Sequence, residues 1–463
     1  MSTQKIASIL IALVFLAAVG TACNLPLVNN GPSADDIASY TVASLTAMAA
    51  GAGTEATPAV DGLPTEAPMA EETVVIPETA PLSVAFVAPD GNAYYWNEFL
   101  SAPTLLVSTN DVNAAYVSPD GTLVALARST DDISYTLDVI NSDGSGLRTL
   151  ITADGFAALP RPVDALSSIP NQVDWLPNSH ILSMNTRLTF EGPGSATGES
   201  LYLINADNGL MTAPITLPDT WYFKYKISPD GTRIAVSLPE GIEIYNLDGS
   251  KLDSKVLAYE FVNTASEYAW VASPVWSADS QTLAAAVPPR EPFAESPEDS
   301  TVWRVSADGL SGEMTFSRQM MYAPGGFAFI SPDLTKILYL TQLDPPSSGQ
   351  FALNLSNLDG TGAVEYAAGS FFAGPAKWST DSTKFYYYDS DHGAFIGQQG
   401  LAPQPLPDFA GVRTVEWIDG SRFIGASGPE GGWKLLLGTV GSATGVIYST
   451  PMTDGSITFT INR

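Results

Sequence analysis

The two histidines of this 463-residue chain, and the acidic residues beside one of them, are the first candidates for chemistry. His392 stands in the run DSDHG with Asp389 and Asp391, a trio whose side chains could hold a cation. His180 stands far away in sequence, in LPNSHI. The two histidines do not have zinc-ligand spacing, and no loop has the alternating oxygen ligands of an EF-hand. We therefore interpret both as turn residues and expect no metal and no cofactor.

Serine and aspartate residues recur through the chain and raise the question of hydrolysis. A serine hydrolase of the nucleophile-elbow type needs a G-x-S-x-G motif, and neither GPGSATG at residues 192–198 nor GSATG at residues 441–445 fits it. The repeated aspartates all follow a similar tripeptide and are interpreted as turn formers. They are Asp120, Asp230, Asp279, Asp333 and Asp381. We expect no catalytic residue and a protein that is not an enzyme.

The elements that carry these aspartates form an internal repeat. YVSPDGTLVALAR at residues 116–128 returns as YKISPDGTRIAVS at residues 225–237. Weaker copies begin at Asp174, Val275, Phe329, Lys377 and Val415. Aromatic or β-branched residues end one strand, the Ser-Pro-Asp-Gly turn reverses the chain, and an apolar run begins the next strand. A second phrase with a tight Asp-Gly turn follows in most copies and adds a third and a fourth strand.

Four antiparallel strands repeated about every 40 to 55 residues are typical of an all-β β-propeller. The copies resemble the WD40-like repeats of the TolB family over residues 81–463, which implies the fold and leaves the function open. That family's N-terminal α/β domain has no counterpart here, so its partners are not carried over. Seven turns predict seven blades. The alternative is an eighth blade, or added outer strands, built from residues 83–109 and closed by residues 456–461.

The composition limits the partners of the protein. Twenty Lys and Arg stand against 49 Asp and Glu, which gives a formal net charge of −29. A field of this sign repels phosphate backbones, so we expect no nucleic-acid partner. An acidic surface also keeps a fold soluble, and we expect a monomer.

The N-terminal residues predict a location outside the cytoplasm. Residues 1–22 read as a signal peptide, with an apolar run from Ile6 to Val19 that is too short to span a bilayer comfortably. The small residues before Cys23, the only cysteine, resemble the lipobox of bacterial lipoproteins, although Gly20 stands where Leu is commonest. This resemblance implies a lipid on Cys23 and an anchor on the periplasmic or cell-surface side of a membrane.

Residues 23–80 follow as an acidic tether. Residues 24–80 hold eight acidic residues and no Lys or Arg, and they are rich in Ala, Thr, Pro and Glu from residue 51 onward. Such a composition cannot bury enough apolar surface to fold by itself. A short helix is predicted over residues 33–51.

Two long segments interrupt the repeat, at residues 158–172 and 288–300. Long loops on a rigid scaffold are where recognition concentrates. We expect a non-enzymatic, lipid-anchored scaffold whose propeller binds a protein or an envelope polymer. The alternatives are a spacer without ligand, and a binder of small molecules or carbohydrate, or an enzyme, with a site at the central channel. That last alternative requires carboxylates or Trp side chains from several blades to converge at one mouth of the channel.

Overall fold

The computed structural model describes residues 80–462 except 130, 132, 192–195, 219, 253–254, 265–269, 323–325, 344–348, 372–375, 413–414 and 429–430. The signal peptide, Cys23, the tether and the helix predicted at residues 33–51 lie outside this part and stay predictions. In this part of the chain strands dominate, and the helices are short, namely α3 (Ala153–Ala157) and the 3-10 helix η2 (Pro407–Phe409). In the described part of the chain, no helix combines the length and the apolar character that crossing a bilayer requires.

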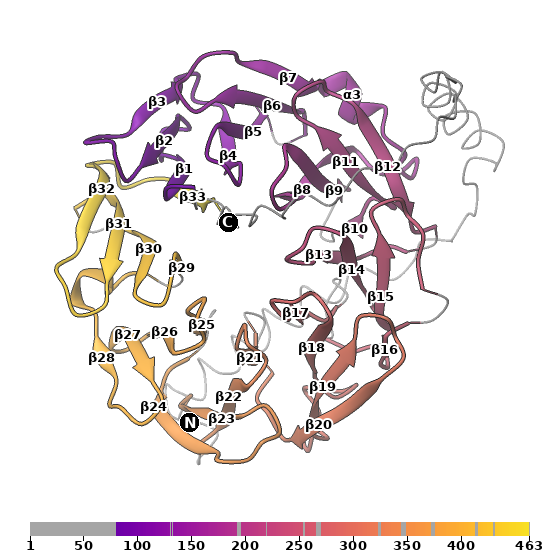
Figure 1. Ribbon diagram of the computed structural model, residues 1–463, viewed down its shortest axis with the longest axis vertical. Coiled ribbons are helices and arrows are strands. Elements are labelled where there is room, and N and C mark those ends of the chain that lie inside the picture. The colour runs from indigo at the N-terminus through magenta and orange to yellow at the C-terminus, as the bar shows by residue number, and fades with distance from the viewer. Residues whose placement is uncertain are drawn as a thin grey trace, which may run out of the picture. The chain divides into compact units, whose positions relative to one another are not determined.

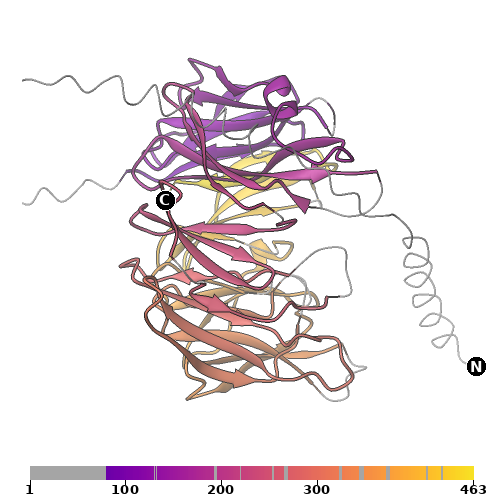
Figure 2. The same ribbon diagram turned by 90° about the vertical axis from the view of Figure 1, so that its right-hand side faces the viewer.

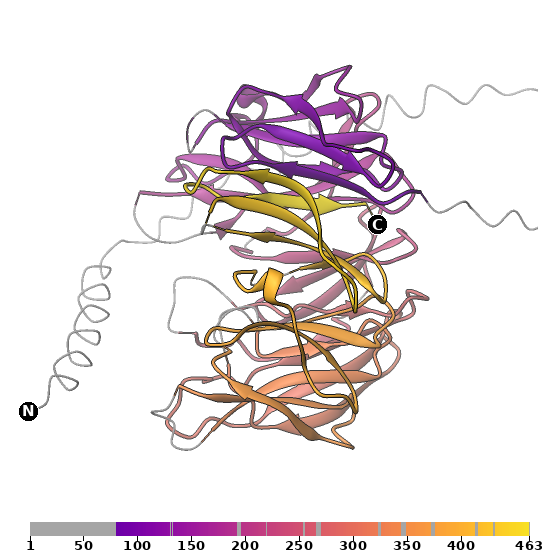
Figure 3. The ribbon, with the colours of Figure 1, turned by 90° about the vertical axis from the view of Figure 1, so that its left-hand side faces the viewer.

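Eight antiparallel sheets surround one axis, and each sheet is a blade of four main strands (Figure 1). We number the blades in chain order, with the first blade taking its innermost strand from the C-terminus. In blades 2 to 8 the chain passes from the innermost strand outward, whereas the innermost strand of blade 1 is the last strand of the chain. The side views show the strands running between two faces of the ring (Figure 2 and Figure 3).

The first four blades have the following strands, in order from the axis outward. Blade 1 contains β33 (Thr458–Ile461), β1 (Ser83–Val87), β2 (Ala93–Asn97) and β3 (Thr104–Val107). Blade 2 contains β4 (Val112–Val117), β5 (Leu123–Ser129), β6 (Tyr135–Asn141) and β7 (Arg148–Ile151). Blade 3 contains β8 (Ser167–Trp175), β9 (Ile181–Thr189), β11 (Ser200–Asn205) and β12 (Met211–Thr216), with the short β10 (Ala196–Thr197) paired to β9. Blade 4 contains β13 (Lys224–Ile227), β14 (Arg233–Leu238), β15 (Gly241–Asn246) and β16 (Leu257–Ala258).

The other four blades follow the same order. Blade 5 contains β17 (Val275–Trp276), β18 (Thr282–Val287), β19 (Ser300–Ser306) and β20 (Gly312–Arg318). Blade 6 contains β21 (Ala328–Ile330), β22 (Lys336–Gln342), β23 (Phe351–Asn357) and β24 (Val364–Gly369). Blade 7 contains β25 (Ala376–Trp378), β26 (Lys384–Asp389), β27 (Gly393–Gln398) and β28 (Gln404–Pro405). Blade 8 contains β29 (Glu416–Trp417), β30 (Arg422–Ser427), β31 (Trp433–Thr439) and β32 (Gly445–Thr450).

The preferred count of seven blades was wrong, and the alternative of eight is what the structure has. Blade 1 joins both ends of the chain, because β33 pairs antiparallel with β1, with Val84 opposite Ile461. Its first and second strands are therefore not connected by a turn. Counting Ser-Pro-Asp-Gly turns misses this blade for that reason. The closure also removes the exposed sheet edge that an open ring would leave.

The same few hydrogen bonds stabilise the turns of the repeat. In the first copy, the Ser118 hydroxyl donates to Asp120 at 2.6 Å and accepts from the Leu123 backbone N–H at 3.0 Å. Asp120 also accepts from the Thr122 backbone N–H at 3.1 Å. Gly121 has a φ of 74°, which glycine adopts without strain. Three copies place a residue other than glycine at the equivalent positive φ, namely Ser280, Leu334 and Ser382.

The hydrophobic core is a series of layers between neighbouring blades. One cluster joins Ala235 of blade 4 to Trp276 and Leu283 of blade 5. Another joins Tyr386 of blade 7 to Trp417 of blade 8. Each blade therefore buries its two faces against its two neighbours, as stacked sheets do.

A tryptophan just before the turn links four pairs of blades. Its indole N–H donates to a backbone carbonyl on the innermost strand of the preceding blade. The bonds run from Trp175 to Tyr116 at 3.0 Å, from Trp276 to Lys226 at 3.1 Å, from Trp378 to Phe329 at 2.8 Å and from Trp417 to Lys377 at 2.9 Å. Each accepting residue also pairs with the second strand of its own blade, as Tyr116 does with Ala125, so the indole is an additional donor from the next blade. Each of these bonds acts as a latch between adjacent blades.

Candidate functional site

The alternation of strand direction gives the ring two chemically different faces. Connections between the first and second strands, and between the third and fourth, emerge on one face, which we call the turn face. Connections between the second and third strands, and from blade to blade, emerge on the opposite face, which we call the loop face. Both long segments singled out in the sequence belong to the loop face.

The repeated aspartates lie on the turn face and are occupied by their own turns. Partial burial acts to raise the pKa of Asp120, but hydrogen bonds from Ser118 and Thr122 outweigh it and lower that pKa to about 2. The other repeated aspartates accept the same bond from the serine two residues earlier, at 2.6–2.7 Å, namely Asp230, Asp279, Asp333 and Asp381. This geometry agrees with their interpretation as turn formers.

His180 lies in the turn of blade 3 and bridges two blades. Its Nε2 lies 3.1 Å from Asp120 of blade 2, and its Nδ1 lies 3.0 Å from Asp207 of its own blade. Desolvation acts to lower the pKa of His180, but the two carboxylates outweigh it and raise that pKa above its ordinary value. The ring therefore favours the charged form between two carboxylates.

One hydroxyl also approaches His180 and invites comparison with a catalytic triad. The Thr122 Oγ1 lies 3.4 Å from the His180 Nε2, but it donates its proton to Asp120 at 2.8 Å. A general base must be neutral and must receive the proton of the nucleophile. Against the effect of desolvation, the two carboxylates raise the pKa of His180, and the Thr122 hydroxyl donates to Asp120 and not to His180. The arrangement therefore has the contacts of a salt link and lacks those of an activated nucleophile.

The trio around His392 does not converge on one point. The His392 Nδ1 lies 2.7 Å from Asp389, which is buried, and Asp389 raises the pKa of His392. Asp391 instead accepts from the Ser370 hydroxyl at 2.6 Å. Among the residues that the structure describes, no group of three or more His, Cys, Asp or Glu side chains could hold a metal ion.

The axis of the ring is lined by one position of the repeat, two residues before the Ser of the turn. Its side chains are all at least partly exposed, whereas most residues directly before and after it are buried between blades. In ring order from blade 1, the residues are Thr460, Tyr116, Asp174, Lys226, Val275, Phe329, Lys377 and Glu416. Lys377 forms an ion pair with Glu416 of the next blade.

The tryptophans and turn aspartates do not meet the condition set for a catalytic or binding site at the channel. The indoles lie between blades and donate to backbone carbonyls. The aspartates are bound within their turns. Charged side chains on the axis come instead from lysines of β13 and β25 and from carboxylates of β8 and β29, which the sequence alone did not single out. The sequence did contain a signal for these residues, because a β-strand places every second side chain on the same side.

The segment at residues 158–172 is a shorter connection than predicted. Helix α3 precedes it, and β8 already begins at Ser167, which pairs with Thr189. The reason is that β9 continues to Thr189 and so offers an edge on which the chain can pair. What remains of the connection exposes two apolar side chains, Val163 and Leu166.

The segment at residues 288–300 lies on the loop face, as a true insertion between β18 and β19. Phe293 is 58% exposed, and its ring centroid lies 5.3 Å from that of Tyr322 in an edge-to-face arrangement. Near its start, the insertion is hydrogen-bonded to Asn263, which lies in the connection between β16 and β17. The Asn263 backbone N–H donates to the Arg290 carbonyl at 2.7 Å, and its side-chain amide donates to Glu291 at 3.0 Å.

A hollow of about 430 Å³ opens where these two connections meet. Its lining residues come from three connections of the loop face and are Glu240, Glu260, Phe261, Asn263, Arg290 and Glu291. Arg290 lies 3.9 Å from both Glu260 and Glu291, at the outer limit of an ion pair. Phe261 is 42% exposed. The hollow thus combines one exposed aromatic ring with polar and charged groups.

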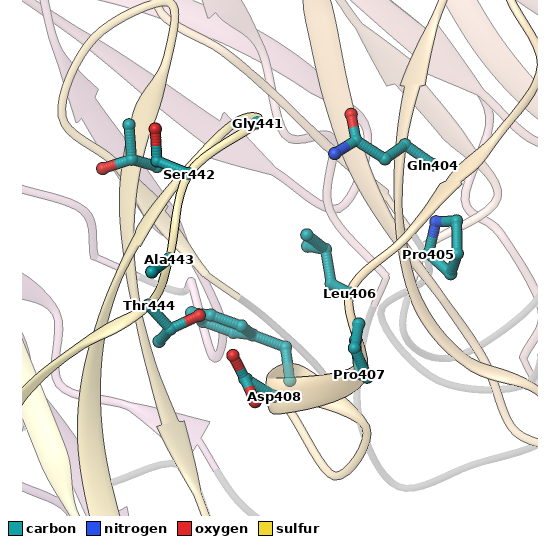
Figure 4. A pocket seen from close by; sticks show the side chains of 11 residues that line it. Gln404, Pro405, Leu406, Pro407, Asp408, Gly441, Ser442, Ala443 and Thr444 are labelled. Carbon is teal, nitrogen blue, oxygen red and sulfur yellow. The ribbon is translucent and has the colours of Figure 1, made fainter.

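A second hollow of about 340 Å³ lies between the outer parts of blades 7 and 8 (Figure 4). It is lined by Gln404 to Phe409, which include β28 and η2, and by the turn from Thr439 to Thr444. Among these described residues, Asp408 supplies the one titratable side chain. A lone carboxylate beside hydroxyl and apolar groups offers no acid–base pair for catalysis.

Comparison with known proteins finds solved structures of low sequence identity and does not assign an activity. No protein-family model matches the sequence, and no curated protein matches it. Among solved structures, TolB from Acinetobacter baumannii is 13% identical with a TM-score of 0.31, over 60% of this chain and 61% of that chain. The chain thus spans less than two thirds of that TolB structure.

Two further structures illustrate the range of activities among similar folds. The β-propeller domain of the Trilobed protease from Pyrococcus furiosus is 12% identical with a TM-score of 0.44, over 73% of this chain and 97% of that chain. An oligogalacturonate lyase from Vibrio parahaemolyticus is 12% identical with a TM-score of 0.43, over 66% and 83%. The predicted β-propeller fold is confirmed by the arrangement of the eight sheets. At these identities the neighbours, enzymes and non-enzymes alike, do not assign a function.

Proposed function

We propose that this protein is a non-enzymatic, lipid-anchored scaffold outside the cytoplasm, and that the loop face of its propeller binds a protein or an envelope polymer. The observation that carries the proposal is the distribution of exposed apolar side chains. Four connections of the loop face, between blade 2 and blade 5, each present at least one. These side chains are Val163, Leu166, Trp221, Phe261 and Phe293.

Among the described residues, the turns of the turn face expose one large aromatic side chain, Phe99, against three on the connections of the loop face. The exposed apolar residues of the turn face stand in the outer turns of separate blades, in ones and twos, namely Phe99, Leu100, Leu147, Leu210, Leu310 and Leu401. Scattered apolar residues are normal on any surface, whereas exposed aromatic groups from neighbouring loops favour an interaction site. Aromatic residues also supply much of the binding energy in protein interfaces.

The chemistry of the described residues supports a binding role over catalysis. Both histidine rings contact carboxylates. The turn aspartates are bound by their own serines. What the loop face offers is contact area and a hollow, which suit recognition.

The anchor rests on the sequence, through the small residues that precede Cys23. The intact mass of protein extracted from membranes should include a diacylglycerol on Cys23, and Cys23→Ala should release the protein from the membrane fraction. Unchanged membrane retention of Cys23→Ala would refute the anchor without touching the loop-face proposal.

The binding role is tested by recovery of a partner from membranes in mild detergent. The test variant is Phe261→Ser with Phe293→Ser, and the matched control is Leu310→Ser, since Leu310 is 87% exposed on the turn face. Truncating two interface aromatics should reduce partner recovery by about tenfold or more. The control should recover the partner as the wild type does. Equal recovery by all three proteins would contradict the use of the loop face.

A further inference from the structure

Strand β13 places two lysines on the same side of the innermost strand of blade 4. Lys224 and Lys226 are exposed, whereas Tyr225 between them is 4% exposed and packs between blades. Residues two apart on a strand lie about 6.7 Å apart on one face. β13 is the innermost strand of blade 4, so its exposed side chains lie beside the axis.

Neither lysine has a charged partner among the residues that the structure describes. The third axial lysine, Lys377, forms its ion pair with Glu416. Across from Lys226, the neighbouring blade contributes Asp174, which accepts a hydrogen bond from Gln172 at 2.8 Å. On the other side, blade 5 places the uncharged Val275 at the equivalent position. Among the described residues of the innermost strands, the blades on either side of β13 thus provide one carboxylate for two ammonium groups.

The charge at this point runs against the charge of the whole chain. The described residues of the innermost strands carry three lysines and two carboxylates, a net charge of +1, in a chain with a net charge of −29. Desolvation lowers the pKa of Lys224, which means that its charged form lacks full compensation. An anion placed beside it would supply that compensation, and more strongly than in bulk water.

The backbone of β13 offers no competing mode of binding by strand addition. Gln172 occupies the Tyr225 backbone, donating to its carbonyl at 2.9 Å and accepting from its N–H at 3.4 Å. Trp276 occupies the Lys226 carbonyl at 3.1 Å. A ligand at this strand therefore meets the lysine side chains and not a free strand edge.

We propose that Lys224 and Lys226 form an axial binding site for a small anion that carries at least two carboxylate or phosphate groups. Ammonium groups are compact point charges that bind such oxygens by charge-assisted hydrogen bonds. The spacing of the two lysines along the strand suits two negative groups on one molecule better than a single one. The site does not involve the loop face, so the result of its test does not affect the proposed function.

The test measures binding of two probes, inorganic pyrophosphate and citrate, to the full-length protein by calorimetry at pH 7.5 and constant ionic strength. Saturable binding of at least one probe is expected. Lys224→Gln with Lys226→Gln should weaken it by about tenfold or more, because two charge-assisted contacts are lost. Lys434→Gln, which removes an exposed lysine from β31, should bind as the wild type does.

Each outcome is informative. Binding of pyrophosphate alone assigns a phosphate ligand, and binding of citrate alone assigns a carboxylate ligand. Absence of saturable binding by both probes, or equal binding by the double variant, overturns the proposal. Circular dichroism establishes that the variants are folded. If the double variant fails to fold, the single variants Lys224→Gln and Lys226→Gln, each expected to bind more weakly, provide the same comparison.

Discussion

The latch between Trp378 and the Phe329 carbonyl predicts a measurable share of the stability of the ring. The substitution Trp378→Phe keeps an aromatic ring between blades 6 and 7 but removes the N–H that donates to the carbonyl at 2.8 Å. Phe329 also pairs with Leu338 of β22, so the carbonyl keeps its partner in the sheet and loses only the indole. Losing one hydrogen bond of this kind costs about 0.5–1.5 kcal/mol of unfolding free energy.

The chain supplies a matched control for the smaller ring. The Trp433 indole N–H is buried, and it has no hydrogen-bond partner among the described residues. Trp433→Phe shortens the side chain in the same way but removes a polar group that is already unsatisfied. Removing this unsatisfied N–H should therefore leave the free energy of unfolding unchanged or raise it.

Urea denaturation of the purified full-length proteins at pH 7, followed by tryptophan fluorescence and circular dichroism, measures both effects. We expect Trp378→Phe to lose about 0.5–1.5 kcal/mol more than Trp433→Phe. If the two variants lose the same free energy within about 0.3 kcal/mol, the latch does not stabilise the ring and the reasoning fails.

Two further predictions concern the turn face. The raised pKa of His180 means that its bonds stabilise the fold below the unfolded-state pKa of about 6.5 and that this stability is lost as the pH rises through the folded-state pKa. His180→Gln should therefore cost about 0.2–1 kcal/mol at pH 5.5 and close to nothing at pH 9, and an equal loss at both values would contradict the salt link. Gly249 has a φ of 86°, and a Cβ there would collide with the Pro214 carbonyl, whereas Gly209, with a φ of 75°, has open space around it. Thermal unfolding should show a clearly larger loss for Gly249→Ala than for Gly209→Ala, and equal losses would show that backbone strain alone decides.

The repeat made the blade predictable from sequence, because each strand and turn is determined by residues close together in the chain. The number of blades was not predictable in the same way. Blade 1 is completed by β33, more than 350 residues after β1, and no turn joins its two innermost strands. The sequence offered this closure as an alternative, and the structure shows that the two ends share one sheet.

For the candidate sites too, roles set by residues close in sequence were predictable and roles set by other blades were not. The roles of Asp120 and its equivalents could be predicted because their partners lie within two residues. The tryptophans were visible at a fixed place in four copies, but their hydrogen-bond partners lie in the preceding blade. Lys224 and Lys226 alternate in the sequence, yet their exposure at the axis depends on the arrangement of all eight blades.

The central claim is that the loop face is the binding face, and site-specific photo-crosslinking in intact cells tests it most directly. A photoreactive amino acid would replace Phe261 on the loop face in one protein and Leu310 on the turn face in another. We predict a discrete crosslinked species from position 261 and none from position 310. Crosslinking from position 310 with none from position 261 would contradict the account.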